Sequence, residues 1–100
     1  MRKLKTAYEL ARSQVETPID VIHTFWRITH NYRQHFSKVL DLGAGDGRFA
    51  LGGQFSSYEG VEIDTSKRPR AGLPANAVIR RGCAFKYPKA GYSACVGNPP

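Results

Sequence analysis

Blocks of apolar and polar residues alternate along this chain, and their periods predict an α/β fold. Apolar positions at helical spacing predict a short helix over residues 4–15 and a second helix from about residue 18. Short apolar runs predict four strands, at residues 37–42, 58–63, 77–81 and 93–97. A further helix is expected from Asp46 to about Gln54, where Gly52 and Gly53 stop it. This order is that of the first half of an open α/β sheet.

The second helix has a clear start and a clear apolar side. Thr17 is a suitable N-cap, Pro18 suits the first helical position, and Asp20 lies in the first turn. Ile19, Ile22 and Phe25 or Trp26 fall on one side. We therefore expect a helix that packs on the sheet.

The composition indicates one small domain with a basic surface. One hundred residues carry 15 Lys and Arg against 8 Asp and Glu, a net charge of +7, which favours polyanionic partners. Cys83 and Cys95 are too far apart for a CxxC pair, which predicts a reducing, cytoplasmic setting. The histidines have no ligand-like spacing, so no metal is expected. No signal peptide or stretch of about 20 apolar residues is found, so no membrane association is expected.

The stretch VLDLGAGDGRF, residues 39–49, predicts a buried strand, a glycine turn and a helix start. Glycines allow close approach of a ligand, and amide hydrogens at a helix N-terminus attract one, so a nucleotide-type cofactor is expected. Arg48 occupies the third glycine position of the dinucleotide pattern G-x-G-x-x-G, and no Gly-Lys-Ser/Thr follows. Glu62 ends the second strand 19 residues after Gly43, where an acidic side chain reaches ribose hydroxyls in doubly wound sheets.

The remaining pattern, D-x-G-x-G-x-G, resembles the cofactor loop of S-adenosylmethionine-dependent methyltransferases. Asn98, Pro99 and Pro100 resemble the (Asn/Asp/Ser)-Pro-Pro-aromatic motif of those that methylate planar nitrogens, and VETPIDVI resembles the N-terminal motif of the gamma-class DNA adenine-N6 enzymes. The order of these motifs disfavours the alpha and beta arrangements. The resemblance spans roughly residues 15–100.

This resemblance implies a Rossmann-like methyltransferase fold with an open, mostly parallel sheet, of which only the N-terminal half, about four strands, is present. The whole chain, residues 1–100, would be the N-terminal part of one catalytic domain. Residues 1–36 would form its helical N-terminal segment, and residues 37–100 the cofactor-binding strands and NPP.

The resemblance also assigns roles at the cofactor, S-adenosylmethionine. Thr17 would lie near its carboxylate, and Asp41 would order the loop and face its amino group. Gly43, Ala44 and Gly45 would allow close approach of the backbone to the cofactor. Glu62 would accept hydrogen bonds from the ribose hydroxyls, and Ile63 would pack on the adenine.

One position departs from the family pattern. Cys83 stands where an acidic residue usually binds the amino group of the cofactor's adenine. Because a thiol is a poor acceptor, this contact is expected to be weakened or moved to backbone, and the preferred interpretation of Cys83 is a plain buried cysteine.

The implied activity is site-specific methylation of DNA adenine N6, of restriction-modification type. Asn98 and the Pro99 carbonyl would accept the two N–H bonds of a flipped adenine. Pro100 is the last residue, so the stacking aromatic of the motif is absent. We expect the fragment alone to be inactive and to bind cofactor weakly, with a second chain or a missing C-terminal half completing it.

Two other functions stay open at this point. A protein glutamine-N5 methyltransferase shares the NPP motif, although the basic charge and the lack of a preceding helical domain disfavour it. A non-catalytic, truncated or split subunit that binds nucleic acid or a partner chain is the other alternative. Whether Arg80, Arg81, Lys86 and Lys89 share a face with Asn98 bears on whether the charge marks a DNA-facing surface.

Overall fold

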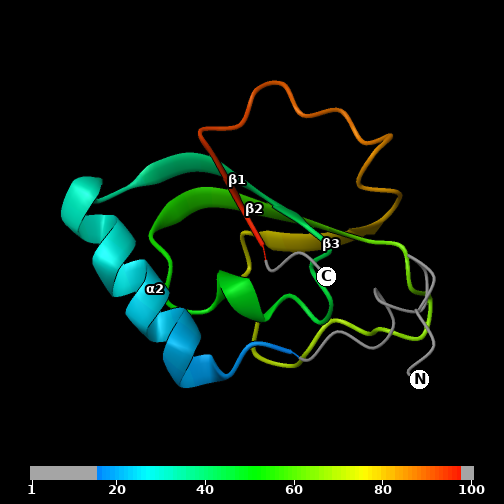
Figure 1. The fold of residues 1–100 in the computed structure, drawn as a ribbon, viewed down its shortest axis with the longest axis horizontal. Coiled ribbons are helices and arrows are strands. Elements are labelled where there is room, and N and C mark those ends of the chain that lie inside the picture. The colour runs from blue at the N-terminus through cyan, green and yellow to red at the C-terminus, as the bar shows by residue number, and fades with distance from the viewer. Residues whose placement is uncertain (1–15, 98–100) are drawn as a thin grey trace, which may run out of the picture.

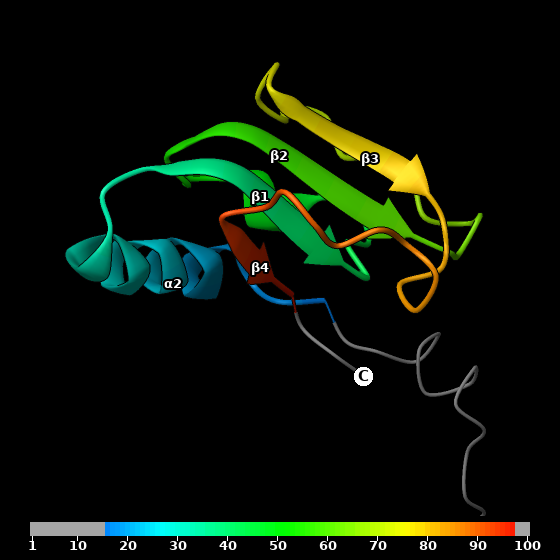
Figure 2. The same cartoon turned by 90° about the horizontal axis from the view of Figure 1, so that it is seen from above.

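The computed structural model describes residues 16–97, which form a four-stranded sheet with one α-helix packed on it. Strands β1 (Phe36–Leu42), β2 (Phe55–Glu62), β3 (Ala77–Arg81) and β4 (Ala94–Val96) lie in the order β3-β2-β1-β4, and every pairing is parallel (Figure 2). The predicted α/β class with a parallel sheet of about four strands is confirmed. The expected helix over residues 4–15 and the NPP motif lie outside the described residues.

The sheet reverses its direction of growth at β1. The chain adds β2 and then β3 on one side of β1, and returns to add β4 on the other side. Crossovers between parallel strands are right-handed, so connections that run in opposite directions must cover opposite faces. Helix α2 (Ile19–Tyr32) and the short turn η1 (Arg48–Ala50) accordingly lie on one face, and residues 82–93 arch over the other (Figure 1). In open α/β sheets such a reversal places the ligand site at the carboxyl ends of the strands.

Helix α2 packs on the sheet through the apolar side that its sequence predicts. Ile22 and Trp26 are buried, and Ile19 and Phe25 pack around them. The Trp26 Nε1–H donates to the Phe49 carbonyl oxygen at 2.8 Å, so the indole fills the core without leaving its polar atom unpaired. This bond joins the helix to the segment that follows the glycine loop.

The expected cap of this helix is wrong in detail. Pro18, not Thr17, is the N-cap, and this N-cap position provides no side-chain hydrogen bond to the helix. The Pro18 carbonyl accepts from the amides of Val21 and Ile22, both at 3.1 Å, while Asp20 in the first turn accepts from Val21 at 3.0 Å. The helix therefore starts one residue later than the capping pattern suggests.

The helix expected from Asp46 to about Gln54 does not form, and only the single 3₁₀ turn η1 is present. Gly47 precedes this turn at φ +85° and Gly52 follows it at φ +88°, both outside helical space. A Cβ on Gly53 would lie 2.8 Å from Trp26 Cε2, so the chain passes close over the indole. Close packing against Trp26 therefore prevents the α-helix that the local sequence favours.

Strand boundaries differ from the prediction by a few residues. β3 matches it, whereas β2 begins at Phe55 and ends at Glu62, which leaves Ile63 beyond the strand. β4 is shorter than expected, although the Ser93 amide still donates to the Lys38 carbonyl at 2.8 Å.

Candidate cofactor site

The candidate site lies at the carboxyl ends of β1 and β2, where the glycine loop leaves the sheet. Asp41 pairs with Gly60 in the parallel register, so Asp41 and Glu62 point to the same face as α2. Gly43 and Gly45 have φ of +76° and +60°, which favours glycine at both positions. Apart from the adjacent residues, no heavy atom of the described part of the chain lies within 4 Å of a Cβ built on either. The loop therefore has open space in front of its backbone.

The amides of this loop are already used within the protein. Gly43 and Ala44 donate to the carbonyl of Val61 at 2.8 and 3.0 Å, and Gly45 donates to Glu62 Oε1 at 2.7 Å. The expectation of free amides at a helix N-terminus is therefore wrong at these three residues, and no α-helix follows the loop. A phosphate would have to displace these bonds, whereas a ligand that packs against the loop would not.

Glu62 ties the glycine loop to the turn after β2. Its side chain is buried, and its second oxygen, Oε2, accepts from the Asp64 amide at 2.8 Å. Each carboxylate oxygen has two lone pairs, so both can accept a further bond from a hydroxyl. Glu62 is thus a fixed acceptor pair next to the open side of the loop.

Asp41 is fully buried, and its two carboxyl oxygens differ in their surroundings. The Tyr58 hydroxyl donates to Oδ2, and within residues 16–97 Oδ1 has no hydrogen-bond partner. Burial raises the pKa of Asp41 to about 7; the Tyr58 bond opposes this rise and the charge of Glu62 adds to it. A Cβ on Gly97, the residue after β4, would lie 3.2 Å from Oδ1. The unpartnered oxygen therefore lies beside the end of β4.

Tyr58 is the residue of this site that sequence reasoning missed. It faces the same side of β2 as Gly60, the register partner of Asp41, and its ring is buried. A tyrosine on the buried face of a strand needs a partner for its hydroxyl, and the nearest acid on the neighbouring strand is the natural candidate. The need for such a hydrogen-bond partner is the sequence signal that could have linked Tyr58 to Asp41.

Arg48 joins Thr17 to the glycine loop and was also missed. Its guanidinium donates to the Thr17 carbonyl at 3.0 Å, to Glu16 at 2.6 Å and to Asp46 Oδ2 at 2.9 Å. Burial would raise the pKa of Asp46, but the hydrogen bonds and charge of Arg48 outweigh it and lower that pKa. Arg70 adds a contact to Asp46 at 3.8 Å. The segment before α2 is thereby fixed beside the loop, as the assignment of Thr17 to the cofactor requires.

The remaining assigned residues lie at the same edge of the sheet. Ile63 follows β2 directly and is 61% exposed, so it offers an apolar surface to solvent. Cys83 is a half-buried free thiol in the turn after β3, and the amide of the preceding Gly82 donates to the Glu62 carbonyl at 3.2 Å. Phe85, in the same turn, is 95% exposed and had no role assigned from the sequence.

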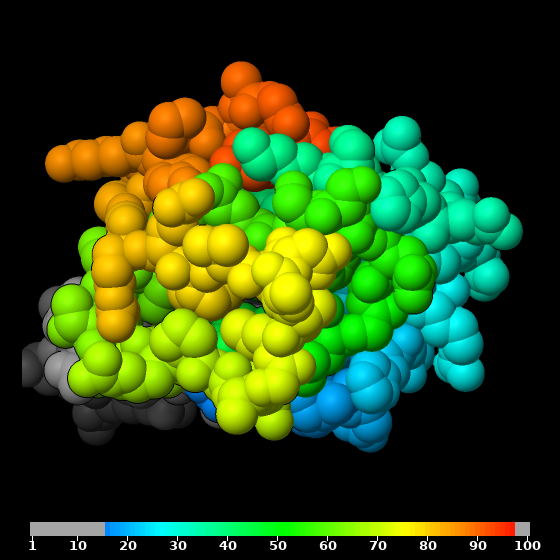
Figure 3. Space-filling view, turned by 180° about the vertical axis from the view of Figure 1, so that it is seen from behind, coloured from blue at the N-terminus to red at the C-terminus, as the bar shows by residue number. Residues whose placement is uncertain are grey.

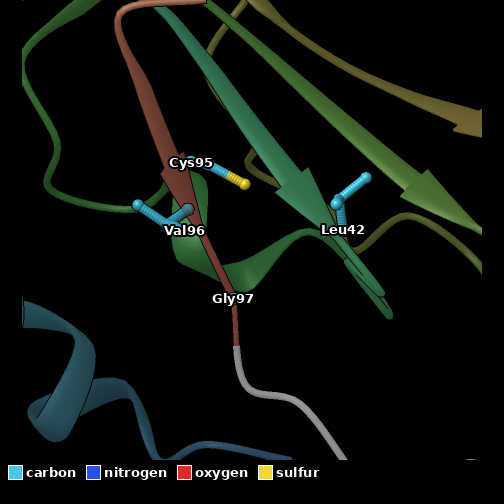
Figure 4. A pocket seen from close by; sticks show the side chains of 4 residues that line it. All are labelled: Leu42, Cys95, Val96 and Gly97. Atoms are coloured by element: carbon cyan, nitrogen blue, oxygen red, sulfur yellow. The ribbon is translucent and has the colours of Figure 1, made fainter. Parts of the chain in front are cut away.

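A shallow cavity of about 280 Å³ marks the point where the sheet reverses. It is lined by Leu42 at the end of β1 and by Cys95, Val96 and Gly97 of β4 and its end. Figure 4 shows the Cys95 side chain pointing toward β1 and Val96 pointing away from it. Asn98, Pro99 and Pro100 follow this point in the chain and lie outside the described residues.

No protein-family model, curated protein or solved structure matches this chain. The residues the structure describes contain no helix long and apolar enough to cross a membrane. Within the same part of the chain, no three His, Cys, Asp or Glu side chains are grouped as metal ligands.

Proposed function

We propose that this chain is the cofactor-binding part of an S-adenosylmethionine-dependent methyltransferase that methylates adenine N6 in DNA, of restriction-modification type. One observation carries the proposal: within residues 16–97 the buried carboxyl of Asp41 has an oxygen without a partner, next to an open glycine loop and the end of β4. An orphaned buried acceptor is costly and points to a donor supplied by a ligand.

S-adenosylmethionine fits this arrangement because it has an ammonium group, a ribose and an adenine but no phosphate. Asp41 Oδ1 would accept from the ammonium group, and Glu62 from the ribose hydroxyls. Ile63 would pack on the adenine ring. Gly43 and Gly45 leave room for the cofactor to lie against the backbone. When bound, the cofactor supplies a methyl group on a positively charged sulfur.

The substrate side of the proposal depends on residues 98–100. Gly97 lies beside Asp41, so the chain leaves the cofactor site directly into Asn98 and Pro99. The Asn98 amide oxygen and the Pro99 carbonyl would hold the two N–H bonds of the target nitrogen, with Pro100 completing the turn. Such a site acts by position and electrostatics, without an acid or base of its own.

Calorimetric titration with S-adenosylmethionine tests the cofactor site. We expect weak binding by the chain, loss of binding in Glu62→Gln, and unchanged binding in the control Asp20→Asn, which alters an exposed carboxylate on α2. Low-micromolar affinity would show that no further part is needed for cofactor binding. Equal affinity of Glu62→Gln and the unaltered chain would contradict the assigned site.

Transfer of a radiolabelled methyl group decides the substrate class. The enzyme tested is the longest natural protein whose sequence includes residues 1–100. It is incubated in parallel reactions with DNA and with a protein that contains the glutamine substrate. We expect label on DNA. Label only on protein would favour glutamine-N5 methylation, and label on neither would favour a non-catalytic subunit.

A further inference from the structure

The face of the sheet opposite to α2 carries a cluster of basic side chains. In the parallel register Lys38, Glu59 and Arg80 all point to this face, whereas Asp41 and Glu62 point to the other. Residues 82–93 lie over the same face (Figure 1). In the space-filling view they form the upper edge of the molecule, well separated from α2 at the lower right (Figure 3).

Only one acidic side chain from the four strands and residues 82–93 faces this way, and it is already fully engaged. Glu59 Oε1 accepts from Arg80 Nε, and Oε2 accepts from the Tyr92 hydroxyl. Tyr87 also hydrogen-bonds to this carboxylate. Only 14% of the Glu59 side chain is exposed, so little of its charge reaches solvent.

The cations around Glu59 are held by contacts with the same tyrosines. Lys38 Nζ lies 4.8 Å from the centroid of the Tyr92 ring, and Lys89 Nζ donates to the Tyr87 carbonyl at 3.1 Å. Arg80 stays 56% exposed despite its ion pair. Lys38, Arg80 and Lys89 each contact Glu59 or a tyrosine that hydrogen-bonds to it, and we call these three residues the basic cluster.

Arg81 does not belong to the basic cluster, although it is next to Arg80 in the sequence. It points to the opposite face, where its guanidinium donates to the carbonyls of Asp64 at 2.6 Å, Thr65 at 3.3 Å and Lys67 at 3.1 Å. It therefore holds the turn after β2. The sequence analysis named four basic residues. Of the other three, Arg80 lies on the face that residues 82–93 cover, and Lys86 and Lys89 lie in that covering segment.

Basic residues near the glycine loop form more ion pairs with acidic side chains than the residues of the basic cluster do. Arg48 pairs with both Glu16 and Asp46, and Lys67 lies 3.5 Å from Glu16. Within the described residues Lys38 and Lys89 have no ion pair of this kind. Lys38 and Lys89 thus add positive charge without a described ion-pair partner to the face that α2 leaves open.

We propose that the basic cluster binds the phosphodiester backbone of nucleic acid, on a surface separate from the cofactor site. Lysine and arginine beside ordered aromatic rings are typical of surfaces that follow a nucleic-acid strand. An anionic membrane fits less well, because membrane-surface binding typically uses an amphipathic helix and the described residues place none on this face. The surface would serve the proposed DNA methyltransferase, but its binding needs no cofactor.

Fluorescence anisotropy with labelled oligonucleotides, single-stranded and duplex, tests the surface without cofactor. We expect Lys38→Glu combined with Lys89→Glu to weaken binding of either form more than about tenfold, since each lost phosphate contact removes a salt-dependent term. For duplex DNA, the slope of log affinity against log salt should fall in magnitude by about 1.8.

The matched control combines Arg27→Glu on α2 with Arg68→Glu in the turn after β2, which lowers the net charge by the same amount. Equal weakening in this control, or binding to anionic vesicles but not to oligonucleotides, would overturn the proposal. If the glutamate variants do not fold, the corresponding glutamine pairs make the same comparison. Calorimetric titration with S-adenosylmethionine separates the two proposals, because the basic cluster variants should retain cofactor binding.

Discussion

Replacing Asp41 with asparagine should change stability and cofactor binding in opposite directions. The carboxyl is fully buried, with one oxygen bound by Tyr58 and the other without a partner among residues 16–97. Asparagine keeps the size and an acceptor for Tyr58 but cannot ionise. Asp41→Asn should therefore remove the cost of burying the charge, together with the acceptor proposed for the cofactor's ammonium group.

The pKa of Asp41 fixes the sign and size of the stability change. Burial raises this pKa from 3.8 to about 7, so the folded state holds the proton more tightly than the unfolded state. Asp41 thus contributes stability below pH 3.8 that is lost as the pH rises through about 7. At 1.36 kcal/mol for each pKa unit, the loss is about 4 kcal/mol. That is a large share of the 5–15 kcal/mol typical of small domains.

Urea denaturation at a series of pH values measures this change. Trp26, the single tryptophan, is buried and reports unfolding by its fluorescence. The difference in unfolding free energy between Asp41→Asn and the unaltered chain should grow in favour of the variant by about 4 kcal/mol from about pH 4 to about pH 8. Taking the difference cancels the opposite trend from Glu59, whose hydrogen bonds to Tyr92, Arg80 and Tyr87 lower its pKa against the effect of burial.

Cofactor binding should show the reverse pH dependence. Affinity of the unaltered chain for S-adenosylmethionine should rise with pH through about 7 as Asp41 ionises, and Asp41→Asn should lose both the affinity and its pH dependence. Asp20→Asn is again the control. A difference curve that stays flat between about pH 4 and about pH 8 would refute the reasoning about Asp41.

Two further substitutions test the walls of the site. Gly60→Ala should lower the free energy of unfolding by about 1–3 kcal/mol, because its Cβ would lie 2.6 Å from the Ala44 Cβ. Urea denaturation measures this loss, and unchanged stability would contradict the close packing of β2 against the glycine loop. Arg48→Ala should cost about 1–3 kcal/mol and expose the segment at Thr17 to proteolysis, since it removes three charge-assisted contacts. Protection equal to that of the unaltered chain would rule out this role for Arg48.

Local sequence patterns determined most of the elements of this protein. The apolar side of α2, four parallel strands and the glycine turn after β1 all follow from the spacing of apolar residues and glycines, because these patterns reflect burial and backbone freedom directly. Glu62 could likewise be named from its place at a strand end, and Asp41 from the resemblance of the glycine loop. Their side chains do lie on one face.

The tertiary structure decided what these residues do there. Only the packing over Trp26 replaces the expected helix after the glycine loop with a 3₁₀ turn. Only the register of β1 and β2 brings Tyr58 onto Asp41, and one carboxylate oxygen is left unpartnered within the part of the chain that the structure describes. The return of the chain to β4 sets Gly97 beside that oxygen. Each depends on contacts between residues far apart in the sequence, which local periodicity does not encode.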